Sequence, residues 1–191
     1  LQLLPAWMRT EGISLKSIGL FALIGVPYTW KFLWSPAMDK YVLPFLGRRR
    51  GWMLVTQIAL LLSIASFGFF NPKDSLMSIA IVALLVTFFS ASQDIVIDAY
   101  RREILPDHEL GFGNSIHVNM YRIAGLIPGS LALILADTME WKYVFFVVAA
   151  FMGVGIILTL MISEPKLLSK PRTLAAAVIE PFKEFIGRKG W

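Results

Sequence analysis

SASQDIVIDAYRRE, residues 90–103, continues an apolar run that opens near Leu76 and places two carboxylates within it. A charged side chain inside the hydrocarbon of a membrane costs several kcal/mol, so it is rarely present without a function. Asp94 and Asp98 are four residues apart, and at about 100° per residue they share one face of a helix. The same stripe carries further polar side chains, namely Thr87, Ser90 and Arg101. The pattern predicts a helix that turns this stripe toward other helices or a water-filled cavity.

The composition of the whole chain indicates a membrane protein. Of its 191 residues 57% are hydrophobic and 16% are charged, and the mean hydropathy is +0.66. A soluble domain of this size carries about 25% charged residues. The 18 Lys and Arg residues outnumber the 13 Asp and Glu residues. In a membrane protein such an excess marks cytoplasmic loops rather than a surface for nucleic acid. The absence of cysteine excludes disulfides and cysteine-bound metals.

Apolar runs of about 20 residues, the length that crosses ~30 Å of hydrocarbon, divide the chain into segments. Residues 1–7 are too short to span and are interpreted as the last turns of a helix whose beginning is absent. The expected spans are 14–34, 52–70, 76–101, 113–136 and 142–162, and Ser14 is the expected cap of the first of them. A polar and basic loop is expected over residues 35–51. Because the chain does not begin with Met, we interpret it as a fragment at both ends.

The segment after the last span, residues 164–191, reads as a basic linker on the cytoplasmic side. Apolar residues recur in it at helical spacing, namely Leu174, Val178, Phe182 and Phe185. This spacing predicts a short amphipathic helix at the membrane surface. A disordered linker with a chance pattern is the alternative.

The distribution of positive charge predicts the orientation. If the spans alternate in direction, 12 of the 18 Lys and Arg residues fall on one side and 4 on the other, with Lys31 and Arg122 inside spans. The positive-inside rule then places the loop after span 14–34, the loop after span 76–101 and the tail in the cytoplasm. The result is a six-helix unit with both ends inside.

Three titratable side chains are candidates for proton coupling. Asp94 has no basic partner within four residues on its own helix, whereas Asp98 has Arg101 and Arg102 within reach. A structural ion pair is therefore the alternative for Asp98. His117 is the third candidate, because histidine is a common proton carrier, although a lone histidine is more often a hydrogen-bonded packing residue.

Other polar side chains within spans are candidates for solute binding. Arg122 lies near the expected bilayer midplane, where it requires a carboxylate, carbonyls, water or an anionic ligand. A structural pairing with Asp94 is the alternative. Lys31, which shares a face with Tyr28, lies near the end of its span, where snorkelling toward water is the alternative. No phosphate loop, metal cluster, catalytic triad or nucleic-acid motif is evident, so we expect no enzymatic activity, no cofactor and no metal.

Three separated motifs in order carry a family resemblance. They are KFLWSP at residues 31–36, FLGRRRGW at residues 45–52 and ASQDIVIDA at residues 91–99. The loop resembles that between helices two and three of the major facilitator superfamily, although Ser35 replaces the first glycine of the family motif and about five extra residues precede Gly47. Together the motifs resemble the AmpG-type muropeptide permeases, and related acetyl-coenzyme A transporters carry a similar pattern.

This resemblance implies an all-α membrane protein, the N-terminal six-helix half of a major facilitator-type transporter with its first helix truncated. It implies a proton-driven importer of anhydromuropeptides in the bacterial inner membrane, a second half of the same chain after residue 191, and a substrate site between the halves. It also implies that the cytoplasmic side is latched by Asp39, Arg48, Arg49 and Arg50. A large polar glycopeptide suits a cavity lined by Gln93, Asn114, Asn119 and Tyr121.

Two other functions stay open. One is transport of another large polar or anionic solute, such as acetyl-coenzyme A. The other is a membrane scaffold whose polar stripe serves only the association of helices. Carboxylates at depth favour transport, because a scaffold has little need for them.

Overall fold

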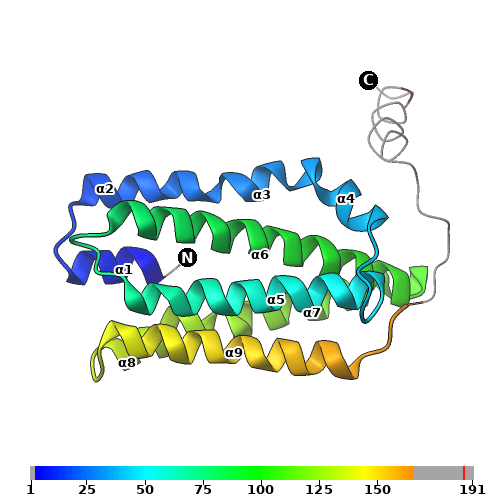
Figure 1. Cartoon of the computed structure of the whole chain (residues 1–191). Helices are drawn as coiled ribbons and strands as arrows, with labels where there is room; N and C mark the ends of the chain where they lie inside the picture. Colours follow the sequence, from blue (N-terminus) through cyan, green and yellow to red (C-terminus); the bar gives the residue numbers. More distant parts are fainter. Residues whose placement is uncertain (1–2, 166–186, 188–191) are drawn as a thin grey trace.

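The computed structural model describes residues 3–165 and residue 187, and the described residues form helices and no strand. In Figure 1 the long helices lie side by side and are joined at the two ends of an elongated bundle. The prediction of an all-α fold is confirmed. The proposed amphipathic helix of the tail lies outside the described residues, and the division at residue 164 stays a prediction.

Within residues 3–165, four helices are long and apolar enough to cross a membrane. They cover Arg48–Phe69, Leu76–Ile104, Asp107–Ala136 and Trp141–Met161. The first consists of α5 (Arg48–Ser66) and η3 (Phe67–Phe69), and the second is α6 (Leu76–Ile104). The third consists of η4 (Asp107–Glu109), α7 (Leu110–Ala124), η5 (Ile127–Leu131) and α8 (Ala132–Ala136). The fourth is α9 (Trp141–Met161). These bounds agree within a few residues with four of the predicted spans.

The first predicted span, residues 14–34, is not one regular α-helix. It consists of α2 (Leu15–Leu20), η1 (Phe21–Gly25), α3 (Val26–Trp30) and η2 (Lys31–Leu33). Pro27 lies in the first turn of α3 and has no amide hydrogen to donate, and Gly25, two residues earlier, is a weak helix former. The regular hydrogen-bond ladder is interrupted as a result. The predicted cap is present, because the backbone N–H of Ser17 donates to Ser14 Oγ over 3.2 Å. The pieces nevertheless follow one track beside α6 (Figure 1).

The expected polar loop 35–51 is shorter than predicted. Residues Ser35–Lys40 form α4, in which Pro36 occupies the first turn, where a missing N–H costs nothing. Helix α5 already begins at Arg48, so only residues 41–47 connect the two. Basic residues expected in a loop therefore stand on a helix end.

Helix α5 lies at the centre of the described bundle and packs against both α6 and α9. At one end of the bundle the short helix α1 (Leu3–Thr10) inserts Trp7 against two phenylalanines. Ring centroids lie 4.8 Å apart for Trp7 and Phe145, and 5.3 Å apart for Phe67 and Phe145. This apolar cluster fixes the ends of α1, α5 and α9 to one another.

The α7–α8 segment is bent and little buried. The residues Ile127–Leu131 form a short π-helix that includes Pro128, as expected where proline breaks the regular ladder. In the most apolar window of the span Asp107–Ala136, 6% of the residues are buried inside the described bundle, whereas the corresponding value for α6 is 44%. Its apolar surface therefore faces outward.

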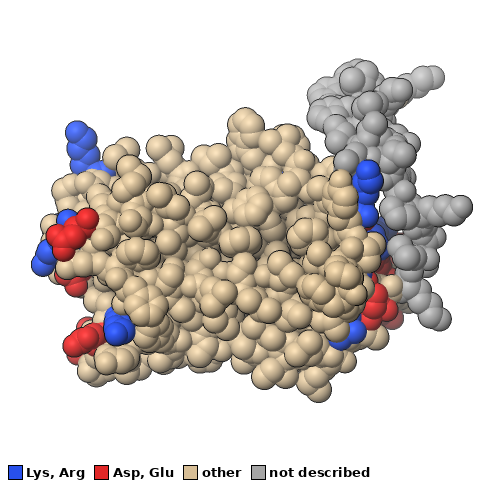
Figure 2. All heavy atoms as spheres, viewed as in Figure 1, with Lys and Arg blue, Asp and Glu red and all other residues tan. Residues whose placement is uncertain are grey.

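Charged side chains lie at both ends of the face of the bundle that Figure 2 displays, and uncharged side chains cover the middle. This distribution is that of a protein whose middle lies in hydrocarbon and whose ends lie in water or among headgroups.

Candidate functional site

A charged cluster joins helix ends around the buried side chain of Arg49, which is 4% exposed. Its Nη1 donates to Asp39 Oδ1 over 2.6 Å, and its Nη2 donates to Glu103 Oε1 over 2.6 Å. Arg48 Nη2 donates to the same oxygen of Glu103 over 2.7 Å. Because these bonds are charge-assisted and largely shielded from water, they hold α4, α5 and α6 together.

Glu164 adds the end of α9 to this cluster. Its two carboxylate oxygens accept the backbone N–H groups of Arg49 and Arg50 over 2.8 and 3.0 Å. These N–H groups belong to the first turn of α5, which has no partner for them within the helix, and the carboxylate also complements the positive end of the helix dipole. The guanidinium of Arg50 in turn donates to the carbonyls of Thr159 and Leu160 over 3.0 and 2.8 Å.

The four predicted latch residues thus come together in one cluster, but two of its carboxylates were not predicted. Glu103 lies 54 and 55 residues after the two arginines it binds, and Glu164 lies 115 and 114 residues after Arg49 and Arg50. Sequence spacing shows pairs within a helix, such as i and i+4, and carries no signal for contacts between distant helix ends.

Asp94 lies half-buried in the middle of α6. Lys31 of η2 and His117 of α7 are close enough to act on its charge. No hydrogen bond or ion pair joins Asp94 to Arg122 among the described residues, so the structural pairing that was the alternative for Arg122 is not seen in this part of the chain. Periodicity places Arg122 on α7 but does not fix the direction in which that helix is turned.

Asp98 is exposed and forms an ion pair with Arg101, with 2.9 Å between Oδ1 and Nη2. The partner expected at i+4, Arg102, instead lies 3.4 Å from Asp107. The geometry agrees with the structural alternative for Asp98, since its charge is matched within its own helix.

A row of tyrosines and a serine lies near Asp94. The hydroxyls of Tyr28 and Ser90 are 2.6 Å apart, which ties α3 to α6. Tyr121 of α7 lies near Tyr28, and the residue is 72% exposed. Tyr28, Lys31 and His117 are thus ionisable side chains near Asp94, and Tyr121 is a neighbour of Tyr28.

Gln93 does not lie where the sequence analysis placed it. Its side chain is 7% exposed and accepts a hydrogen bond from Thr56 of α5, so it joins α5 to α6 instead of lining a cavity. Asn114 and Asn119 are exposed on α7, and Asn119 Nδ2 donates to the Ser115 carbonyl of its own helix over 2.9 Å. The substrate contacts proposed for these two asparagines stay predictions.

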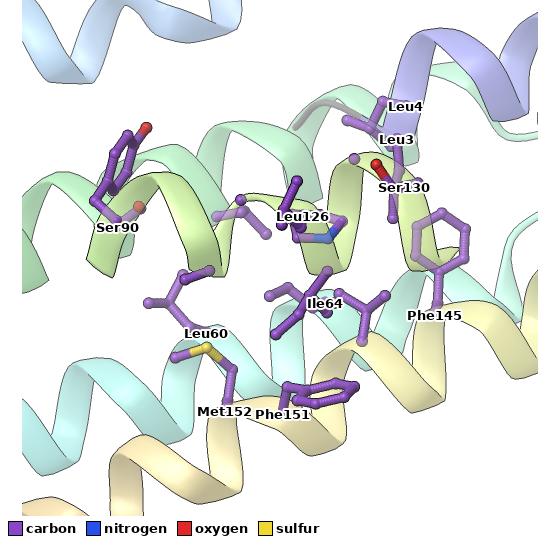
Figure 3. A pocket seen from close by; sticks show the side chains of 18 of the residues that line it. Leu3, Leu4, Leu60, Ile64, Ser90, Leu126, Ser130, Phe145, Phe151 and Met152 are labelled. Carbon is purple, nitrogen blue, oxygen red and sulfur yellow. The ribbon is translucent and has the colours of Figure 1, made fainter. Parts of the chain in front are cut away.

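A cavity of about 970 Å³ lies between α1, α5, α6, α9 and the bent α7–η5 segment. Figure 3 shows Leu60 and Ile64 of α5, Phe145 and Met152 of α9 and Ser90 of α6 turned toward this space. Most of its wall is apolar, and Arg122 is its one charged lining residue among the described residues. Cavities of this kind, with few polar groups in an apolar wall, are typical of ligand sites.

Further polar contacts bridge the helices without reaching the cavity. Trp34 Nε1 donates to Ser92 Oγ over 3.0 Å, and Thr159 Oγ1 donates to Gln57 Oε1 over 2.9 Å. Buried hydrogen bonds of this kind hold membrane helices together. Within the described part of the chain no group of three metal-ligating side chains gathers.

Apolar helices of membrane-crossing length, with charge at the ends of the bundle and a carboxylate within one helix, define a multi-pass membrane protein. The chain belongs to the Major Facilitator Superfamily, whose family model matches residues 2–191.

Several relatives are similar over nearly the whole chain. An uncharacterized protein of Haemophilus influenzae is 48% identical over 99% of this chain and 45% of its own length. The anhydromuropeptide permease of Escherichia coli K12 is 48% identical over 97% of this chain and 38% of its own length. A putative transporter of Rickettsia conorii, AmpG 1, is 34% identical over 81% of this chain and 38% of its length. The chain therefore spans less than half the length of these relatives.

Proposed function

We propose that this chain is part of a proton-coupled secondary transporter that imports anhydromuropeptides across the bacterial inner membrane for recycling of the cell wall. The observation that carries the proposal is the 48% identity to the Escherichia coli anhydromuropeptide permease over 97% of this chain. Since the chain covers 38% of that permease, the activity is proposed for a whole transporter embedded in a lipid bilayer, with the muropeptide and a proton as its ligands. The role is transport rather than catalysis.

Asp94 is the proposed proton-coupling group. It stands half-buried in an apolar helix, and Lys31 and His117 are close enough for their charges to act on it. A side chain that changes partners on protonation can favour different helix arrangements in its two states. Asp98 is matched by Arg101, so its part in coupling is secondary to that of Asp94.

The cluster around Arg49 is the proposed cytoplasmic latch. Three carboxylates bind the start of α5: Asp39 of α4, Glu103 of α6 and Glu164, which follows α9. The start of α5 therefore joins the ends of these three helices. Helices tied at their ends in this way move together, which suits a transporter whose halves rock against each other. The positive-inside rule favours the cytoplasm for this end.

Uptake by a full-length protein in liposomes tests the proposal. Labelled anhydromuropeptide is expected to accumulate when the outside is more acidic than the inside, and a protonophore is expected to abolish the accumulation. Accumulation that ignores the pH gradient would contradict proton coupling. Uptake of acetyl-coenzyme A in place of muropeptide would favour the other solute class, and a scaffold would give no uptake of either.

A further inference from the structure

Among the residues that the structure describes, Arg122 differs from the arginines of α5 and α6 in having no hydrogen-bond or ion-pair partner. Four of those five donate a hydrogen bond to a carboxylate or to backbone carbonyls, namely Arg48, Arg49, Arg50 and Arg101, and Arg102 forms an ion pair with Asp107. The guanidinium of Arg122 forms no hydrogen bond or ion pair with any residue that the structure describes. An arginine inside a membrane span requires a partner for its charge, and such residues mark pathways for ligands.

Arg122 lines the cavity between the helices, whereas Asp94 does not. His117 and Tyr121 are four residues apart on one face of α7, near Asp94 and Tyr28 respectively. Arg122 is one residue further, which turns its side chain by about 100° around the helix. It lines the cavity of about 970 Å³ together with residues of α1, α5, α6 and α9, and Tyr28, Ser90 and Tyr121 line the same cavity.

Arg122 is exposed within the described residues, and the cavity that it lines has mostly apolar walls. Figure 3 shows Leu60 and Ile64 of α5 opposite Leu126, with Phe145 and Phe151 of α9 closing one side. Apolar walls lower the effective dielectric constant, so a single charge acts more strongly there than in water. The described lining includes no acidic side chain that would neutralise it.

We infer that Arg122 is the specificity residue that binds a carboxylate of the transported solute, in a subsite of the cavity separate from Asp94. The planar guanidinium presents two parallel N–H groups that match the two oxygens of a carboxylate. The inference rests on the proposed function, because the peptide part of a muropeptide supplies such a carboxylate. The inference assigns to Arg122 neither the sugar part of the muropeptide nor the transported proton.

Binding measurements on the full-length protein in lipid nanodiscs test this inference. The probes are an anhydromuropeptide with free peptide carboxylates and the same compound with those carboxylates amidated. Wild-type protein is expected to bind the amidated probe roughly 10- to 100-fold more weakly, the range of a charged hydrogen-bonded contact. Arg122→Gln is expected to bind both probes with the same low affinity, and Arg122→Lys is expected to retain part of the preference. Arg9→Gln, at a helix end, is the control and should discriminate as the wild type does.

Two results would overturn the inference. One is equal affinity of the wild type for the two probes, a result that does not depend on the folding of any variant. The other is an Arg122→Gln protein that still prefers the free carboxylate, or that loses affinity for both probes by the same factor. Wild-type protein that binds neither probe would instead refute the proposed function, and the inference with it.

Discussion

Gly47 shows how a single residue permits the contact between α5 and the end of α9. Its backbone has φ 89° and ψ −170°, a region occupied almost only by glycine. A Cβ at this position would lie 2.8 Å from Cδ of Glu164. The glycine therefore serves both the turn into α5 and the close approach of the carboxylate that caps it.

Gly47→Ala is expected to destabilise the protein more than Gly12→Ala. Gly12 also has a positive φ, 83°, but a Cβ there would have nothing within 4 Å. The strained backbone alone should cost about 1–3 kcal/mol at either position. At Gly47 the displacement of Glu164 adds to this cost, so thermal unfolding of the detergent-purified proteins should begin at a lower temperature. Equal midpoints for the two variants would show that the Glu164 contact contributes nothing.

The sequence predicts the positions of some functional residues and not those of others. Asp94, Asp98 and their polar stripe follow from helical periodicity alone, and Arg101 was recognised as a partner for Asp98. Glu164 could not be predicted, because its partners Arg49 and Arg50 lie more than a hundred residues earlier in the chain. Periodicity also does not say which polar residues face a cavity and which join two helices.

At the scale of elements, the buried guanidinium of Arg49 is the point where α4, α5 and α6 meet. Its charge is matched by Asp39 and Glu103. Removing one partner of a shielded ion pair leaves the other charge without compensation, which costs more than the pair itself contributes.

Glu103→Gln is therefore expected to lower the free energy of unfolding by about 2–3 kcal/mol. The matched control is Asp107→Asn, which breaks the exposed pair with Arg102 and should cost less than about 1 kcal/mol. Denaturant unfolding in mixed micelles measures both. A Glu103→Gln protein as stable as the control variant would mean that the cluster does not hold the three helices together.

Long elements were predictable and irregular ones were not. The spans that became α5, α6 and α9 are uninterrupted apolar runs, and hydropathy alone sets their approximate bounds. The segment 14–34 was also apolar, but hydropathy does not register the loss of a regular ladder around Pro27. The polar residues of α4 favour a loop in a hydropathy-based prediction, although Pro36 in the first turn is a signal for the start of a helix.

At the scale of the whole molecule, charge separates the two ends of the bundle. The end with α4 and the start of α5 carries the cluster around Arg49, and the opposite end carries Lys73, paired with Glu11 at 3.6 Å. The sequence predicts which end faces the cytoplasm, and this orientation stays a prediction.

Cysteine labelling tests the orientation. Lys40→Cys and Lys73→Cys both place a thiol at an exposed position, in a chain that has no cysteine of its own. In spheroplasts a membrane-impermeant maleimide should label position 73 at once and position 40 only after lysis. Labelling of both positions from outside would contradict the predicted topology.

Asp94 is the one carboxylate in α6 that is proposed to couple the whole transporter to the proton gradient. Its substitution by asparagine fixes a neutral side chain of the same size. Asp98→Asn is the matched control, four residues away on the same helix and matched by Arg101.

The most direct measurement is gradient-driven uptake of labelled anhydromuropeptide by full-length Asp94→Asn and Asp98→Asn proteins in liposomes, with exchange of internal for external substrate measured in parallel. We expect Asp94→Asn to exchange substrate but not to concentrate it, because a permanently neutral side chain cannot release a proton. We expect Asp98→Asn to concentrate it, with its main effect on stability. An Asp94→Asn protein that still accumulates muropeptide against its gradient would contradict the account.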